Sequence, residues 1–280
     1  MKFILPLFAV FIASCQSKLS TITELPKSLQ ENSGIVSMRK KHLWLIEDSG
    51  NTDQMYETNF KGKIIRKLKV KNATNKDWED LTKDPEGNVY IGDIGNNQSK
   101  RKDLVVYKIP NPEKEKGKKI DAEKIRFYYP EQKKFPPKKK YLYYDAESLF
   151  YKDHNLYIVT KNRSQPFNGT ALIYKIPAVK GHHKAQLIDT LNLCTDWNSC
   201  QVTSADISPD GTTLVLLSYG KLFIISDFIG DAFSKGRMET IDLGTSTQLE
   251  AVCFLDPNTL LLTDEKKGST GKKLYTYELK

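Results

Sequence analysis

The sequence predicts an all-β fold, a five-bladed β-propeller that is closed by a strand from the N-terminal part of the chain. One pattern returns five times: a small or acidic residue opens an apolar strand, and a second strand follows about ten residues later. The strand-opening residues are Ser33, Glu79, Glu147, Ser204 and Glu250. They lie 46, 68, 57 and 46 positions apart, which is the spacing of propeller blades. The 280 residues leave no room for a sixth blade of roughly 40–50 residues.

Each of the first four repeats predicts four strands, because runs of alternating, β-branched or aromatic residues are separated by turn residues. The first blade is expected to contain 34–38, 43–46, 55–58 and 64–70. The second is expected to contain 80–83, 89–92, 104–109 and 124–129. The third is expected to contain 148–151, 156–160, 171–176 and 185–191. The fourth is expected to contain 205–208, 214–217, 221–225 and 238–243.

The fifth repeat supplies only three strands, at 251–255, 259–263 and 274–279. The segment 19–24, Leu-Ser-Thr-Ile-Thr-Glu, has the alternation of a strand and is the expected fourth member. Its addition would close the ring and remove an open sheet edge. Proline- and glycine-containing segments such as 84–88 and 208–211 are expected to be hairpin turns, since their acidic residues lack the spacing of a calcium loop.

The first residues predict an export signal. Lys2 precedes an apolar run, 3–12, that is too short to span a bilayer, and the run ends in Ile-Ala-Ser-Cys15, which resembles a bacterial lipobox. We therefore expect residues 1–14 to be a lipoprotein signal peptide. The alternative is an ordinary signal peptide cut nearby, with Cys15 as a bystander.

Cys15 would then carry the lipid anchor, with acyl chains such as palmitate, and attach the protein to the bacterial cell envelope at the outer membrane. Residues 15–18 would form a short tether, and 19–280 a single propeller domain.

Export to an oxidising compartment makes a disulfide between Cys194 and Cys200 an expectation, because only five residues separate them. Cys253 lies inside an apolar strand and is expected to be a buried free thiol. A zinc site is not indicated, since the sequence has no CxxC motif and its four histidines lack ligand spacing.

The formal net charge of +9 is concentrated in residues 112–140, which hold ten Lys and one Arg against five acids. The segment 132–140 contains two prolines and is expected to be a loop. It would contact anionic lipid headgroups or a phosphorylated or other anionic ligand, or else be a solvated loop. Nucleic acid is not expected, because no recognition motif accompanies the charge.

The strand-opening glutamates point to a metal site. Three carboxylates facing a narrow axial channel would repel one another, and a divalent cation would relieve that repulsion. We expect Ca2+ to be held by Glu79, Glu147 and Glu250 with Ser33 and Ser204. Asp206 lies two residues after Ser204 and could replace or support it. In the alternative interpretation the acids pair with Lys161, Arg163 or Lys266, or accept backbone hydrogen bonds.

The order Ser33, Glu79, Glu147, Ser204, Glu250 resembles the calcium-activated nucleotidases, or soluble apyrases. These are five-bladed propellers in which a Ser, Glu, Glu, Ser, Glu ring holds one calcium in the central tunnel. Asp48, at the end of a strand in blade one, also matches that family. The loops that contact nucleotide in the family have no counterpart here, and stretches such as 78–81, 87–97 and 145–149 are similar to a group of uncharacterised exported bacterial propellers.

Two functions follow. The first is a membrane-anchored lipoprotein with a calcium-binding propeller that binds a surface or envelope ligand. The alternative is a calcium-dependent phosphohydrolase, nucleotidase-like, acting on nucleoside phosphates or other phosphate esters. For this the sequence offers Asp48, Asp93 or Asp264 as the base and Lys161 and Arg163 as phosphate ligands. A closed ring is expected to be a monomer.

Overall fold

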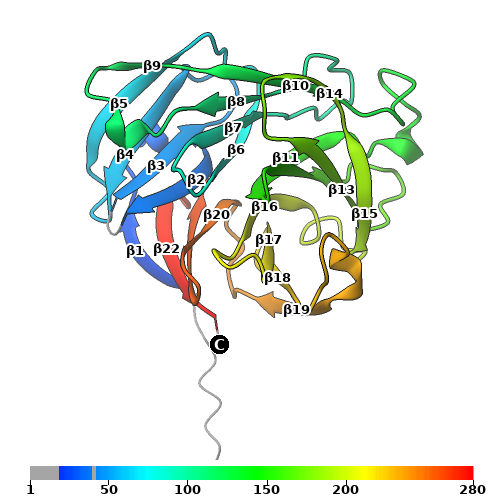
Figure 1. Ribbon diagram of the computed structural model, residues 1–280. Coiled ribbons are helices and arrows are strands. Elements are labelled where there is room, and N and C mark those ends of the chain that lie inside the picture. Colours follow the sequence, from blue (N-terminus) through cyan, green and yellow to red (C-terminus); the bar gives the residue numbers. More distant parts are fainter. Residues whose placement is uncertain (1–18, 40–41, 280) are drawn as a thin grey trace, which may run out of the picture.

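The computed structural model describes residues 19–39 and 42–279. The expected signal peptide and the expected lipidation site at Cys15 lie outside the described residues. Five small, mainly antiparallel sheets surround a central channel, so the predicted five-bladed β-propeller is confirmed (Figure 1). Within the described residues, no helix is both long enough and apolar enough to cross a membrane.

The blades follow the sequence order, each starting at the channel and ending at the outer rim. Blade one contains β2 (Asn32–Arg39), β3 (His42–Glu47), β4 (Gln54–Asn59), β5 (Ile64–Lys71) and β9 (Lys119–Asp121). Blade two contains β6 (Trp78–Lys83), β7 (Val89–Asp93), β8 (Val105–Ile109), β10 (Glu123–Tyr128) and β14 (Gly181–Lys184). Blade three contains β11 (Asp145–Lys152), β12 (Asn155–Lys161), β13 (Thr170–Pro177) and β15 (Gln186–Asn192). Blade four contains β16 (Val202–Ile207), β17 (Leu214–Ser218), β18 (Lys221–Ser226) and β19 (Arg237–Asp242).

The ring is closed by the N-terminal strand, as the sequence predicted. Blade five contains β20 (Leu249–Asp256), β21 (Thr259–Asp264), β22 (Lys273–Glu278) and β1 (Ser20–Glu24). β1 runs antiparallel to β22, with Ser20 opposite Thr276 and Glu24 opposite Lys273, and Figure 1 shows the blue strand beside the red one. Closure removes an outer edge that would otherwise be open to pairing with another chain.

Two short outer strands were not predicted. β9 pairs in parallel with β5, and β14 pairs in parallel with β10, so each of these blades gains a fifth strand from a later part of the chain. β14 contains the paired histidines His182 and His183, and it forms the outer edge of blade two. Four single-turn 3-10 helices complete the described structure: η1 (Lys27–Leu29), η2 (Pro112–Lys114), η3 (Lys139–Tyr141) and η4 (Phe233–Lys235).

The core lies between the blades. Five apolar clusters of described residues fill the spaces between successive sheets, and the cluster between blades five and one completes the circle. Trp44 and Trp78 are fully buried in the cluster of blades one and two, while Phe150 stacks on Tyr157 between blades three and four. Because every blade packs on two neighbours, the innermost strands are held rigidly around the channel.

Candidate functional site

One mouth of the channel is built from the loops between the second and third strands of the blades, together with the segments that connect the blades. The loop after β7 meets the start of β11, since the backbone N–H of Asn96 donates to Asp145 Oδ1 at 2.6 Å. The lysine-rich connection before β11 lies on the same side, where Arg163 N donates to Leu142 O at 2.9 Å. Loops carried by a rigid scaffold are the usual place for binding groups.

Three carboxylates converge at this mouth. Asp48 directly follows β3, Asp77 directly precedes β6, and Glu79 is the second residue of β6; one oxygen from each lies within 4.8 Å of the others. We call these three residues the acidic triad. Gly95 packs against them so closely that a Cβ there would lie 2.1 Å from Glu79 Oε1, so a larger residue at this position would displace the carboxylates of Glu79 and Asp77.

The acidic triad carries uncompensated charge. Burial and the neighbouring carboxylates raise the pKa of Asp77 to about 6 and the pKa of Glu79 well above its ordinary value. Burial also raises the pKa of Asp48. In residues 19–39 and 42–279, no lysine or arginine forms an ion pair with any of the three.

Glu79 is the most confined member of the acidic triad. Glu79 is only 7% exposed, and no hydrogen bond to its carboxylate is found in the described part of the chain. A buried acid without a partner is costly, and a bound cation would supply that partner. Carboxylate oxygens are hard ligands that suit Ca2+ or Mg2+, so these residues fit a divalent metal ion.

Glu147 has a different environment, because two cations neutralise it. Lys161 Nζ contacts Glu147 Oε2, and Arg163 donates to Glu147 Oε1 at 3.0 Å and to Asp145 at 2.7 Å. Burial lowers the pKa of Lys161, but Glu147 and Glu250 raise it more, so this lysine stays charged. Both basic side chains are therefore committed to carboxylates of the protein.

Glu250 is held by neutral donors. Its Oε1 accepts hydrogen bonds from the hydroxyl of Tyr219 at 2.9 Å and from Gln248 Nε2 at 2.8 Å. Gln248 also donates to Glu265 at 2.6 Å. Tyr219 in turn accepts from Lys161 at 3.0 Å, so a continuous hydrogen-bonded chain runs from Glu147 to Glu265 along one wall of the mouth.

Three other residues predicted as metal ligands bind protein groups. The Ser33 hydroxyl donates to Trp78 O at 2.7 Å, and the Ser204 hydroxyl donates to Asp80 Oδ2 at 3.1 Å. Asp206 accepts from the backbone N–H of Phe254 at 2.8 Å and lines a pocket at the opposite mouth, beside the hairpin turns. The innermost strands have an open edge toward the channel, so side chains of this kind satisfy backbone groups of the next blade.

The residues predicted for catalysis are also divided. Asp48 belongs to the acidic triad, whereas Asp93 pairs with Arg101 at 2.8 Å. Asp264 is buried and accepts hydrogen bonds from Lys273 N at 2.7 Å and the Tyr275 hydroxyl at 2.6 Å. Asp93 and Asp264 therefore each bind groups within their own blade.

Asp77 is the site residue that the sequence reasoning missed. It lies outside the apolar strand pattern, just before β6, so the repeat of strand-opening residues does not include it. A signal was present in the sequence Asp77-Trp78-Glu79, because residues i and i+2 of an extended segment lie on the same side.

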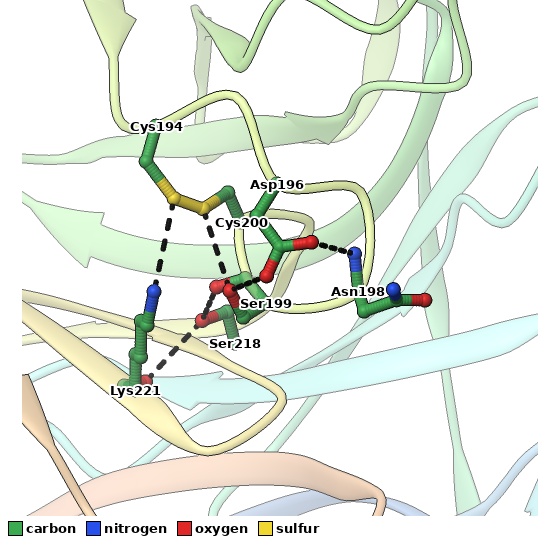
Figure 2. The surroundings of a disulfide bond; sticks show 7 residues. All are labelled: Cys194, Asp196, Asn198, Ser199, Cys200, Ser218 and Lys221. Carbon is green, nitrogen blue, oxygen red and sulfur yellow. Dashed lines mark hydrogen bonds between the residues drawn. A yellow bond between two sulfur atoms is a disulfide. The ribbon is translucent and has the colours of Figure 1, made fainter.

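The two cysteines predicted to pair do form a disulfide, with Cα atoms 5.6 Å apart (Figure 2). The bond closes the loop 195–199, in which the Asp196 carboxylate accepts from Asn198 N at 3.1 Å and from the Ser199 hydroxyl. Ser218 Oγ donates to Ser199 O at 2.8 Å and joins this loop to blade four. Cys253 is a buried free thiol, as expected.

No protein-family model and no curated protein sequence match this chain. Among solved structures it is similar to the PQQ-bound aldose sugar dehydrogenase of Streptomyces coelicolor, with 10% identity, a TM-score of 0.56, and 94% of this chain and 98% of that chain covered. A gluconolactonase from Xanthomonas campestris is also 10% identical, with a TM-score of 0.44 and 85% and 69% of the two chains covered. At such low identity the likeness shows the propeller fold alone.

Proposed function

We propose that this chain is a calcium-binding β-propeller of the bacterial cell envelope, anchored by lipid at Cys15, which binds a ligand at the mouth that carries the acidic triad. The observation that carries the proposal is the convergence of Asp48, Asp77 and Glu79 within 4.8 Å without a basic partner among the described residues. Calcium accepts irregular sets of oxygen ligands, and water or ligand oxygens would complete its coordination.

The topology supports a mouth that faces away from the anchoring membrane. β1 starts at Ser20, opposite Thr276, and reaches the mouth only at Glu24, beside Lys273. The far end of β22 lies at a hairpin turn of the other face, where Leu279 N donates to Asn258 O. A tether from Cys15 to Ser20 would thus hold the hairpin-turn face toward the lipid and present the mouth outward.

The arrangement favours binding over phosphate hydrolysis. A phosphohydrolase needs cations free to hold phosphate oxygens, in addition to the metal. Lys161 and Arg163 were the candidates, and both are paired with Glu147 and Asp145. Hydrolysis of nucleoside phosphates remains the rival function, and phosphate release by the purified chain with calcium or chelator measures it directly.

The metal proposal is tested by thermal unfolding in calcium and in chelator. Calcium at about 100 times its Kd would stabilise the wild-type protein by about 2.7 kcal/mol. Asp77→Asn and Glu79→Gln should each abolish that increment while raising the Tm in chelator, because each removes one of the repelling charges. Glu86→Gln, on a turn of the other face, is the matched control and should keep the full increment. A calcium increment that survives in both triad variants would refute the site.

A further inference from the structure

A second feature of the same face is a pocket of about 480 Å3 between blades four and five. Its walls are the disulfide loop from Trp197 to Ser199, the side chains of Gln201 and Tyr219, the segment 245–248 and Lys267. We call it the Trp197 pocket. Its size falls within the range of small-molecule sites, about 300–1,000 Å3.

The chemistry of the Trp197 pocket is unusual for this charged protein. Its lining contains no carboxylate and a single lysine, with two aromatic residues and seven side chains that end in an amide or a hydroxyl. A lining without carboxylates would not neutralise an organic cation. A single lysine supplies too little positive charge to bind a nucleotide or another polyphosphate. The lining is suited to a ligand with many hydroxyl groups, because a hydroxyl group both donates and accepts hydrogen bonds and the amide and hydroxyl side chains can do both in return.

Several of these polar groups have no protein partner among the described residues. Within residues 19–39 and 42–279, no hydrogen bond is found for the side-chain amide of Asn198 or for the hydroxyl of Ser246. Gln201 is only 3% exposed, and its Nε2 donates to Asn162 O at 2.9 Å, whereas no donor to its carbonyl Oε1 is found in the described part of the chain. These amide and hydroxyl groups are therefore available at the pocket wall to exchange hydrogen bonds with a ligand.

The aromatic wall is held in place. Trp197 is 38% exposed, and its ring meets Phe167 in an edge-to-face contact with centroids 5.3 Å apart. The Cys194–Cys200 disulfide closes the loop that carries Trp197. Figure 2 shows this disulfide together with Asp196, Asn198 and Ser199 of the same loop. A large ring fixed at a pocket wall gives an apolar platform at little cost in side-chain entropy.

From these features we infer that the Trp197 pocket binds a saccharide. The apolar C–H face of a sugar ring would lie on the indole of Trp197, while its hydroxyls would exchange hydrogen bonds with Asn198, Gln201 and Ser246. The inference rests on the proposed ligand-binding function and names its ligand class. The pocket shares a wall with the acidic mouth, because Tyr219 and Gln248 line it and donate to Glu250.

The chain itself provides a specific probe. Of its three tryptophans, Trp44 and Trp78 are fully buried, so acrylamide quenching of tryptophan fluorescence reports on Trp197. The full-length chain would be titrated with oligomers of glucose, mannose, galactose and N-acetylglucosamine, in calcium and in chelator. At least one series should reduce the acrylamide quenching constant severalfold at millimolar concentration.

Variants of the pocket lining test whether the saccharide binds in the Trp197 pocket or elsewhere on the protein. Asn198→Ala combined with Ser246→Ala should weaken the protection at least tenfold, whereas Asn258→Ala, on an exposed turn of the other face, should leave it unchanged. Trp197→Phe should remove the quenchable signal. Protection by no saccharide, or equal protection in the double variant, would overturn the inference. A calcium-induced rise in Tm on the same samples reports on the acidic triad separately, so failure of one site is distinguishable from failure of the other.

Discussion

The carboxylate of Asp80 in blade two accepts a hydrogen bond of 3.1 Å from the hydroxyl of Ser204 in blade four. The same oxygen accepts from the backbone N–H of Leu149, at 3.0 Å, and from that of Ala205, at 3.4 Å. One buried acid thus joins the innermost strands of three blades, β6, β11 and β16. Ser204 also accepts from Val252 N at 3.1 Å, which extends the connection to blade five.

Removal of this carboxylate should destabilise the whole ring. The backbone N–H groups of Leu81, Leu149 and Ala205 and the Ser204 hydroxyl all donate to this carboxylate. Asp80→Ala would remove the acceptor of all four, and each buried group left unsatisfied costs about 1–3 kcal/mol. We expect the free energy of unfolding in urea to fall by at least about 3 kcal/mol. Asp242→Ala is the control, since among the described residues the carboxylate of this exposed acid accepts only from Gly244 N. A similar loss in both variants would contradict the role given to Asp80.

The blades were predictable from sequence because their strands are long, apolar and separated by turn residues. The unpredicted strands, β9 and β14, have three and four residues and are polar. They are extended only because β5 and β10 present free edges to them, which is tertiary information.

The candidate site was predictable only in part. Acids and serines at the channel satisfy backbone groups as readily as they bind metal, so the five equivalent positions could not be sorted by sequence. The structure distinguishes Glu79, for which the described residues supply no partner, from Glu147, which is paired with Lys161 and Arg163. That difference depends on which loops meet across blades, and no spacing in the sequence encodes it.

A second prediction concerns pH and Asp206. Burial raises the pKa of this acid to about 6, although hydrogen bonds from Phe254 N and Ile207 N oppose the rise. The folded state therefore holds its proton more tightly than the unfolded chain, and the contribution of Asp206 to stability falls as the pH rises from about 4 to about 6.

Asp206→Asn removes this titration and keeps an oxygen that can accept from Phe254 N. The variant should match the wild-type protein at pH 4 and gain about 2 kcal/mol relative to it by pH 7. Urea unfolding at half-unit steps of pH measures the difference. A difference that is constant across this range would show that Asp206 does not titrate there.

A third prediction concerns the disulfide that shapes the Trp197 pocket. The bond between Cys194 and Cys200 closes a loop of seven residues, for which the loss of unfolded-state entropy stabilises the folded protein by about 2 kcal/mol. Cys194→Ser with Cys200→Ser should lower the free energy of unfolding by about that amount and raise the acrylamide quenching of Trp197. A reductant should reproduce both effects in the wild-type protein and neither in the double variant.

Cys253→Ala should keep the response to reductant, because Cys253 is a separate, buried thiol. If Trp197 were equally quenched with and without the bond, the pocket wall would owe its position to the Phe167 contact and not to the disulfide.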